Sequence, residues 1–173
     1  GVLLCVRARK SLVKDAPILF STPLTFLFGS ACVAIYPLAF YSSMRLSGVA
    51  IGTVVSIASA PLFAALLEYF LSKKPVSLKW FISFVFGAFG IGMLAMGKAH
   101  DSMALSASKD DQVFGVILGL IAGLTYAGYS WAAKQHIDAG ANSKSAMAGL
   151  FGCAAVALLP SLWFTGQNLF ANT

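Results

Sequence analysis

The chain has 173 residues, of which 58% are hydrophobic and only 10% are charged. Soluble domains carry about 25% charged residues, so this composition excludes a fully water-exposed surface and favours a chain embedded in lipid. The net charge of +6 does not indicate nucleic-acid binding, because no basic patch interleaved with aromatic residues accompanies it. In membrane proteins such an excess usually reflects orientation in the bilayer.

The first predicted element is a short hydrophobic stub, GVLLCVRARK, which has the pattern of a helix that is cut short. Because the chain starts at Gly1 without a Met, we expect it to be an internal fragment of a longer protein. Five charge-free windows follow, at residues 16–44, 46–67, 80–97, 112–133 and 145–173. Each can hold the roughly 17–25 apolar residues of a membrane helix. Since their hydrophobicity is continuous rather than alternating, we predict an all-α, polytopic bundle of five whole helices and one partial helix.

Lysine and arginine residues are distributed unevenly between the two sides of this predicted bundle. Nine fall on the side of segments 7–15, 72–79 and 134–144, and three fall on the other side. Positively charged residues accumulate in cytoplasmic loops, so these three segments are predicted to be cytoplasmic. We expect an integral protein of a bacterial inner membrane, with residues 98–112 as a polar extracytoplasmic loop.

The window at 112–133 contains three glycines at a spacing of four: Gly115, Gly119 and Gly123. This spacing places them on one helix face, where the absence of side chains lets another helix approach closely. The pattern predicts tight helix packing and carries no information about a substrate.

The window at 46–67 combines a proline with helically spaced serines. Pro61 removes a backbone donor and predicts a helix kink, and Ser56 and Ser59 lie on one side of the helix. Freed carbonyl groups and serines in a membrane helix can line a polar path. A serine face that packs against a neighbouring helix is an equally good interpretation.

Two tyrosines lie deeper in their windows than an interfacial anchor would. Tyr36 precedes the second predicted kink residue, Pro37, and Tyr126 lies about two turns from Lys134. Both are candidates to line a substrate pathway. Tyr129 is closer to Lys134, where aromatic residues commonly anchor a helix at the interface.

Glu68 is the only glutamate of the chain and lies one turn before the basic pair Lys73 and Lys74. A charge at the bilayer centre costs about 2.5–3.5 kcal/mol on insertion scales, but Glu68 is expected to lie near the cytoplasmic end. Two interpretations remain open. The carboxylate can be a helix-end charge that pairs with lysine or faces water, or it can contact a substrate amine or couple transport to protons.

Other patterns that carry chemistry are absent from the sequence. His100 and His136 have no second ligand at metal spacing, and no phosphate-binding loop or Ser/His/Asp pattern occurs. We therefore predict no catalytic residue, metal or cofactor. The expected partners are the lipid bilayer and a small solute, without nucleic acid; the sequence does not indicate an oligomeric state. A membrane-embedded enzyme and a non-transporting scaffold subunit are the alternatives.

The stretch FYSSMRLSGVAIGTVVSIASAPLFAALLEYFLSKKPVSLKWFISFVFGAFGIGMLAMG, residues 40–97, resembles the EamA family of the drug/metabolite transporter superfamily. Within it, SIASAPLF at 56–63 is similar to the family's proline-containing helix. The later stretch GVILGLIAGLTYAGYSWAAKQ resembles the first helix of that family's second repeat. The family usually has a Gly-Glu pair where this chain has Lys73 and Lys74, so any role of that turn glutamate is in doubt here.

The resemblance implies a fold of ten helices in two inverted repeats. Residues 1–97 would then be the remainder of the first repeat, from the end of helix 2 to helix 5. Residues 98–112 would be the connecting loop, and residues 113–173 would start the second repeat with helices 6 and 7. The implied function is an exporter or permease of small metabolites or drug-like solutes that works by alternating access, with a proton as the expected coupling ion.

Overall fold

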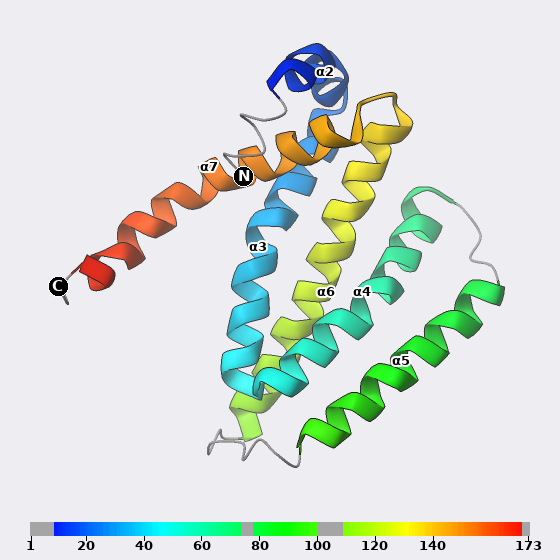
Figure 1. Cartoon of the computed structure of the whole chain (residues 1–173), viewed down its shortest axis with the longest axis vertical. Helices are drawn as coiled ribbons and strands as arrows, with labels where there is room; N and C mark the ends of the chain where they lie inside the picture. Colours follow the sequence, from blue (N-terminus) through cyan, green and yellow to red (C-terminus); the bar gives the residue numbers. More distant parts are fainter. Residues whose placement is uncertain (1–8, 74–77, 100–108, 171–173) are drawn as a thin grey trace. The chain divides into compact units, whose positions relative to one another are not determined.

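The structure is a computed structural model that describes residues 9–73, 78–99 and 109–170. Every regular element in these ranges is a helix, which confirms the all-α fold class (Figure 1). The helices are α2 (Arg9–Ser21), α3 (Pro23–Ser47), α4 (Val49–Leu71), α5 (Leu78–Ala99), α6 (Lys109–Asp138) and α7 (Ser143–Phe170).

Three helices are long and apolar enough to cross a membrane: Pro23–Ser47, Val49–Leu71 and Asp110–Asp138. Within the described parts of α5 and α7, the apolar stretches Trp80–Gly90 and Ser143–Leu159 are shorter. Three of the five predicted spans therefore have the length and composition of membrane helices. The other two stay predictions.

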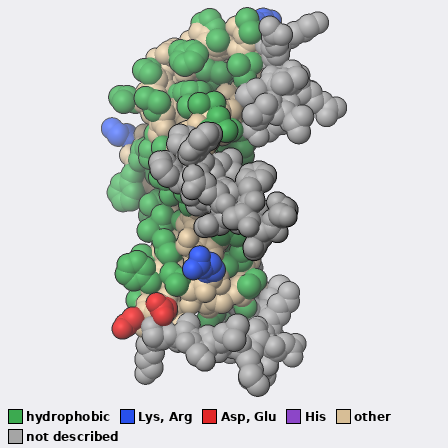
Figure 2. All heavy atoms as spheres, turned by 90° about the vertical axis from the view of Figure 1, so that its left-hand side faces the viewer, with side chains coloured by type: hydrophobic (Ala, Val, Ile, Leu, Met, Phe, Trp, Pro, Cys, Tyr) green, Lys and Arg blue, Asp and Glu red, His purple; other side chains and the backbone are tan. Residues whose placement is uncertain are grey.

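Large apolar side chains cover the outside of the described helices. Leu24 is 82% exposed and Phe86 is 73% exposed, whereas most fully buried residues are alanine or serine. Hydrophobic side chains dominate the face shown in Figure 2, where few charged side chains are visible. Large residues outside and small residues inside are what helices packed in lipid require, because lipid tails are as apolar as leucine.

The first predicted span differs from the observed helices. The window 16–44 contains the end of α2 and most of α3, with a break at Thr22. Pro23 explains the break, since its missing N–H is tolerated at the first helical position and its ring disfavours a helical residue before it. Residues 9–15, predicted as part of a connection, belong to α2; residues 7–8 lie outside the described ranges.

Both ends of the predicted loop at 98–112 belong to helices. Helix α5 continues to Ala99 and α6 begins at Lys109, so the ends of this segment are helical. Its remainder, residues 100–108, lies outside the part of the chain that the structure describes, as does Lys74.

The chain divides into two compact units. Unit 1 comprises α2, residues 23–34 of α3, the end of α6 from residue 132 and α7. Within it α2 packs against α7, and the buried side chains include Leu19, Phe26 and Leu150. Unit 2 comprises residues 35–47 of α3, α4, α5 and α6 up to Trp131.

The turn between α6 and α7 closes both helix ends with backbone hydrogen bonds. Gly140 has φ +101° and donates to the carbonyl of Ile137 at 2.9 Å. Ala141 donates to the carbonyl of His136 at 3.0 Å. This pair of bonds, with glycine in the left-handed region, is the Schellman motif. Asn142 then caps α7, because its side-chain oxygen accepts from the N–H of Lys144 at 3.0 Å.

Asp15 of α2 also stabilises the start of α7. Its carboxylate accepts a hydrogen bond from the backbone N–H of Asn142 at 3.0 Å. The neighbouring Ser145 hydroxyl and this N–H lower the pKa of Asp15, although Ser145 does not reach full hydrogen-bond geometry. A carboxylate at a helix N-terminus is favoured by the helix dipole, so Asp15 links the two helices most strongly when charged.

Replacing Gly140 tests the Schellman turn. A methyl group at Gly140 meets nothing within 4 Å, so Gly140→Ala changes only the backbone preference. Left-handed backbone costs non-glycine residues roughly 1–2 kcal/mol, and we expect the free energy of unfolding to fall by about 1 kcal/mol. Gly87→Ala in α5 is the control, since Gly87 is equally unobstructed and lies inside a helix. Denaturant titration in detergent that shows equal effects for both variants would contradict the turn's role.

The link through Asp15 predicts a dependence of stability on pH. A pKa lowered in the folded state stabilises the fold above the unfolded pKa of about 3.9, and this contribution disappears as pH falls through the folded value. We expect Asp15→Asn to lower the melting temperature at pH 7 and to match the parent once the pH falls below the folded pKa of Asp15. Asp138→Asn controls for loss of one acidic charge. A gap in melting temperature between the parent and Asp15→Asn that does not narrow as the pH falls through the acid range would refute the link.

Candidate functional site

Helix α6 approaches α3 and α4 through its glycine face. A Cβ atom at Gly115 would lie 2.6 Å from the backbone nitrogen of Ser47, and one at Gly119 would lie 2.9 Å from the Ser43 hydroxyl oxygen. At Gly123 it would collide with the Ser59 hydroxyl and lie 3.0 Å from the carbonyl oxygen of Ser56. These distances are too short for real Cβ contacts, so the crossing requires glycine at all three positions.

The serine hydroxyls at this crossing find acceptors on nearby backbone. Ser43 donates across the crossing to the carbonyl of Gly115 at 2.7 Å. Ser56 donates to the carbonyl of Gly52 at 2.7 Å, one turn earlier in α4. Ser59 donates to the carbonyl of Ser56 at 3.3 Å. Polar groups that donate to helix carbonyls can be buried without the cost of an unpaired hydroxyl.

A cavity of about 470 Å³ adjoins this crossing within unit 2. Three helices contribute to it: α3, α4 and α6. The residues that line it are Tyr36, Ser56, Ile57, Ala60, Pro61, Ala64, Tyr126, Ala127 and Ser130. Its volume is within the 300–1,000 Å³ of small-molecule sites. Three of the five predicted pathway residues, Tyr36, Ser56 and Tyr126, meet here although they are far apart in sequence.

The other predicted pathway residues lie elsewhere. Ser59 is 8% exposed and packs against Gly123 rather than lining the cavity. Glu68 is half-buried, nearer the end of α4, and its carbonyl accepts from the N–H of Ser72 at 3.1 Å. Of the two predicted kink residues, Pro61 lines the cavity and Pro37 does not. Both lie inside continuous helices.

Three tyrosines form a cluster on one side of the cavity. The ring centroids of Tyr36 and Tyr126 are 5.6 Å apart with planes at 62°. Tyr129 lies 5.1 Å from Tyr126 and 6.4 Å from Tyr36, again edge to face. Such pairs are worth about 0.5–1.5 kcal/mol beyond burial. Tyr129, interpreted from sequence as an interfacial anchor, is therefore part of this cluster. Its spacing of three from Tyr126 predicts their contact, whereas its contact with Tyr36 on another helix was not indicated.

Pro61 changes the polarity of the α4 side of the cavity, opposite the tyrosine cluster. A proline has no N–H, so the carbonyl four residues earlier loses its helical donor. That carbonyl belongs to Ile57, which lines the same cavity. The α4 side therefore presents a carbonyl without its usual amide partner among otherwise small side chains.

The end of α4 is tied to α6 near the cavity. The indole N–H of Trp131 donates to the Ser72 hydroxyl at 3.0 Å. Ser72 is the C-terminal cap of α4, and the next residue, Lys73, has φ 51°. This left-handed backbone conformation is one that glycine adopts more readily than lysine does.

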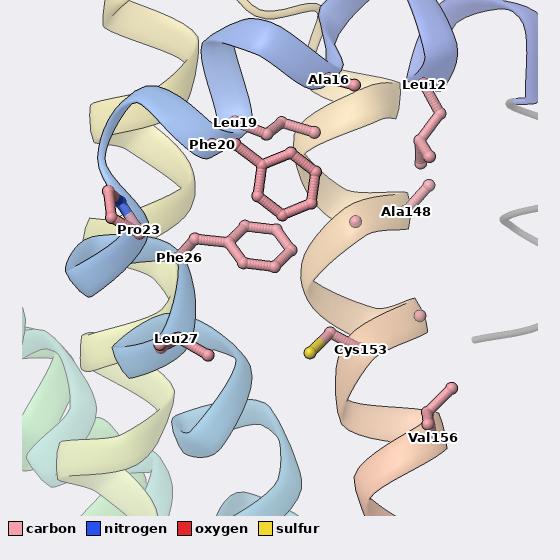
Figure 3. A pocket seen from close by; sticks show the side chains of 12 residues that line it. Leu12, Ala16, Leu19, Phe20, Pro23, Phe26, Leu27, Ala148, Cys153 and Val156 are labelled. Atoms are coloured by element: carbon pink, nitrogen blue, oxygen red, sulfur yellow. The ribbon is translucent and has the colours of Figure 1, made fainter.

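Unit 1 contains a larger cavity of about 630 Å³ between α2, α3 and α7 (Figure 3). Phe20 and Phe26 extend into it from one side, and Cys153 lies on α7 opposite. Only apolar side chains and glycine line it. A solute is oriented by a few placed polar groups, so the smaller cavity of unit 2 is the better candidate for recognition.

His136 is a buried residue whose environment the sequence did not indicate. It was expected in a connecting segment, but it lies in the last turn of α6, is fully buried, and packs edge-on at 6.0 Å from the Phe26 ring. Neither ring nitrogen has a hydrogen-bond partner. Over the described ranges, no group of three metal-ligating side chains is present.

Comparison with known proteins finds one informative similarity. The chain is 32% identical over 141 residues to the uncharacterized transporter YwfM of Bacillus subtilis, a match that covers 82% of this chain and 44% of that protein. The chain thus spans less than half the length of this relative. The similarity supports a transporter. Together with the three helices that are able to cross a membrane, this similarity also supports a membrane protein. The name of the relative is compatible with the expectation that the chain is not an enzyme.

Two further comparisons give no match. No protein-family model matches the chain, and no solved structure matches it.

The crossing beneath the cavity can be tested by adding one methyl group. In Gly123→Ala the new Cβ must displace the Ser59 hydroxyl and the nearby α4 backbone, and overpacking of this kind costs about 1–3 kcal/mol. The double variant with Ser59→Ala should recover part of that loss, because these neighbours are energetically coupled. Gly90→Ala, which meets nothing within 4 Å, is the control. Unfolding in detergent that shows no loss for Gly123→Ala would contradict the tight crossing.

Proposed function

We propose that this chain is part of a membrane transporter for small organic solutes, and that the solute contacts the cavity of unit 2. The observation that carries the proposal is the convergence of Tyr36, Ser56 and Tyr126, from three helices, on one cavity beside Pro61. The similarity to a protein named a transporter supports the same function from an independent direction.

The cavity has features that suit transient binding. It combines apolar surface with hydroxyl groups and a backbone carbonyl that lacks its helical donor, so a solute can be oriented without being held by a strong ion pair. In transporters, backbone groups without helical partners commonly line the binding site. Here α4 is continuous through Pro61, and the carbonyl of Ile57 is the group that loses its donor. The segment that follows Pro61 in α4 leads to Ser72, whose hydroxyl accepts a hydrogen bond from Trp131.

We also propose the finer assignments that the sequence suggested. These are membership of the EamA family in the drug/metabolite transporter superfamily, a place within a ten-helix inverted repeat, and export by alternating access. The domain boundaries at 97 and 112 belong to the same proposal. What supports them is the resemblance in residues 40–97 and 115–135.

The proposed orientation places residues 7–15, 72–79 and 134–144 in the cytoplasm of a bacterium, with the protein in its inner membrane. The nine-to-three distribution of lysine and arginine supports it. The turn of α6 and α7, residues 139–142, would then lie on the cytoplasmic side with Asp15 and the end of α4.

The proposal predicts that transport depends on the tyrosine side of the cavity. In proteoliposomes of the complete protein loaded with a metabolite mixture, we expect net solute efflux that falls at least tenfold in Tyr126→Leu, because the ring that contacts the solute is removed. Tyr69→Leu is the matched control, since Tyr69 is 55% exposed and is not among the residues that line the cavity. Absence of any solute flux with folded protein would exclude transport and favour a scaffold subunit.

Glu68→Gln in the same vesicles addresses proton coupling. If Glu68 carries the coupling proton, the variant loses the pH dependence of flux while solute binding is kept. Unchanged flux with unchanged pH dependence would show that the carboxylate is a helix-end charge.

A further inference from the structure

We propose that the cavity of unit 2 selects organic cations of single positive charge with an apolar body, such as alkylammonium ions, over neutral and anionic solutes. This inference deepens the proposed function and rests on it for the role of the cavity in transport. The predicted binding of the cation does not depend on the proposed function, because it follows from the chemistry of the cavity.

The tyrosine side favours positive charge. The faces of aromatic rings carry partial negative charge and attract a cation within about 6 Å of the ring centre. Tyr36 and Tyr126 both line the cavity, and Tyr126 is 43% exposed, so part of its ring remains accessible to a bound molecule. The edge-to-face contacts with Tyr129 at 5.1 and 6.4 Å hold these rings in place.

The α4 side offers acceptors rather than donors. Ser56 has committed its O–H to the carbonyl of Gly52, so its oxygen faces a ligand with lone pairs only. The carbonyl of Ile57 lacks the amide that Pro61 cannot supply. Both residues line the cavity. An ammonium N–H or the polarised methyl groups of a quaternary ammonium would find partial negative charge on this side as well.

The lining contains no positively charged side chain that could pair with an anion. None of the nine lining residues is lysine, arginine or histidine, and none is acidic. An anion would lose its hydration beside the tyrosine rings and would have hydroxyl groups but no positive charge as partners, an arrangement that costs free energy. A compact, strongly hydrated cation also loses too much hydration here, which is why a soft organic ammonium with an apolar body fits best.

A set of three similar molecules separates charge from shape. Choline, its uncharged carbon isostere 3,3-dimethylbutan-1-ol, and the anion 3,3-dimethylbutanoate have similar volumes and differ in charge. We would titrate each into the complete, detergent-solubilised protein and measure dissociation constants by calorimetry. We expect choline to bind roughly 2- to 30-fold more tightly than the neutral isostere, the range that cation–π contacts give, and the anion to bind most weakly.

Variants locate the selectivity in the cavity. Tyr126→Leu should reduce the preference for choline over the isostere toward one, whereas Tyr126→Phe keeps the ring and should retain most of it. Tyr69→Leu, outside the lining, should leave the preference unchanged. If Tyr126→Leu fails to fold, the selectivity of the parent and of Tyr126→Phe still decides the question.

The outcomes distinguish this proposal from the proposed function. Equal or tighter binding of the neutral isostere or the anion overturns cation selectivity, as does a preference that survives Tyr126→Leu in folded protein, or no binding of any of the three. If solute flux is measured together with one of these results, the proposed transport function stands and the proposed substrate class is rejected. If cation selectivity depends on Tyr126 but no solute flux is measured, the binding site is supported and the proposed transport function is rejected.

Discussion

The close approach of α6 to α3 and α4 is the contact on which the candidate site depends. Lipid offers no hydrophobic force that joins helices, so they must associate through packing and hydrogen bonds. Gly115, Gly119 and Gly123 provide the packing, and Ser43 adds the hydrogen bond to the Gly115 carbonyl. One turn beyond Gly123, Tyr126 and the buried Ala127 contribute to the cavity lining. The cavity thus adjoins the tightly packed crossing, and Ser56, Ala60 and Ala127 belong to its lining.

Two serines one turn apart on α4 take different places in this arrangement. Ser59 fills the space left by Gly123, whereas Ser56 reaches the cavity. From sequence both fitted a packing face and a path equally well, and their different environments come from the position of α6. Because each hydroxyl donates to a carbonyl of α4, neither needs a partner from another helix. This leaves the freed carbonyl at Ile57 as the polar feature that Pro61 adds.

The sequence predicted the local features well and the contacts between helices in part. Continuous apolar windows predict helices because the bilayer requires internal backbone hydrogen bonds, and glycine spacing identifies a helix face. The break at Thr22 was missed because Pro23 at the start of a helix leaves the hydropathy unchanged. The burial of His136, the Asp15–Asn142 contact and the place of Tyr129 depend on how one helix is rotated against another. That rotation is set by the packing of the whole bundle, so it cannot be predicted from a local pattern in one sequence.

The location of charge limits how any proton coupling can work. Glu68 and Lys73 lie toward the end of α4, and the cavity lining has no titratable carboxylate, lysine or histidine. Glu68 is not among the residues that line the cavity, so a proton bound there does not need direct contact with a solute beside Tyr126. Coupling without such contact would act by changing the relative free energies of two arrangements of the α4 segment between Pro61 and Ser72, whose far end Trp131 holds. A ligand or proton shifts such an equilibrium only by its difference in affinity for the two arrangements, so coupling through Glu68 requires its environment to change when that segment moves.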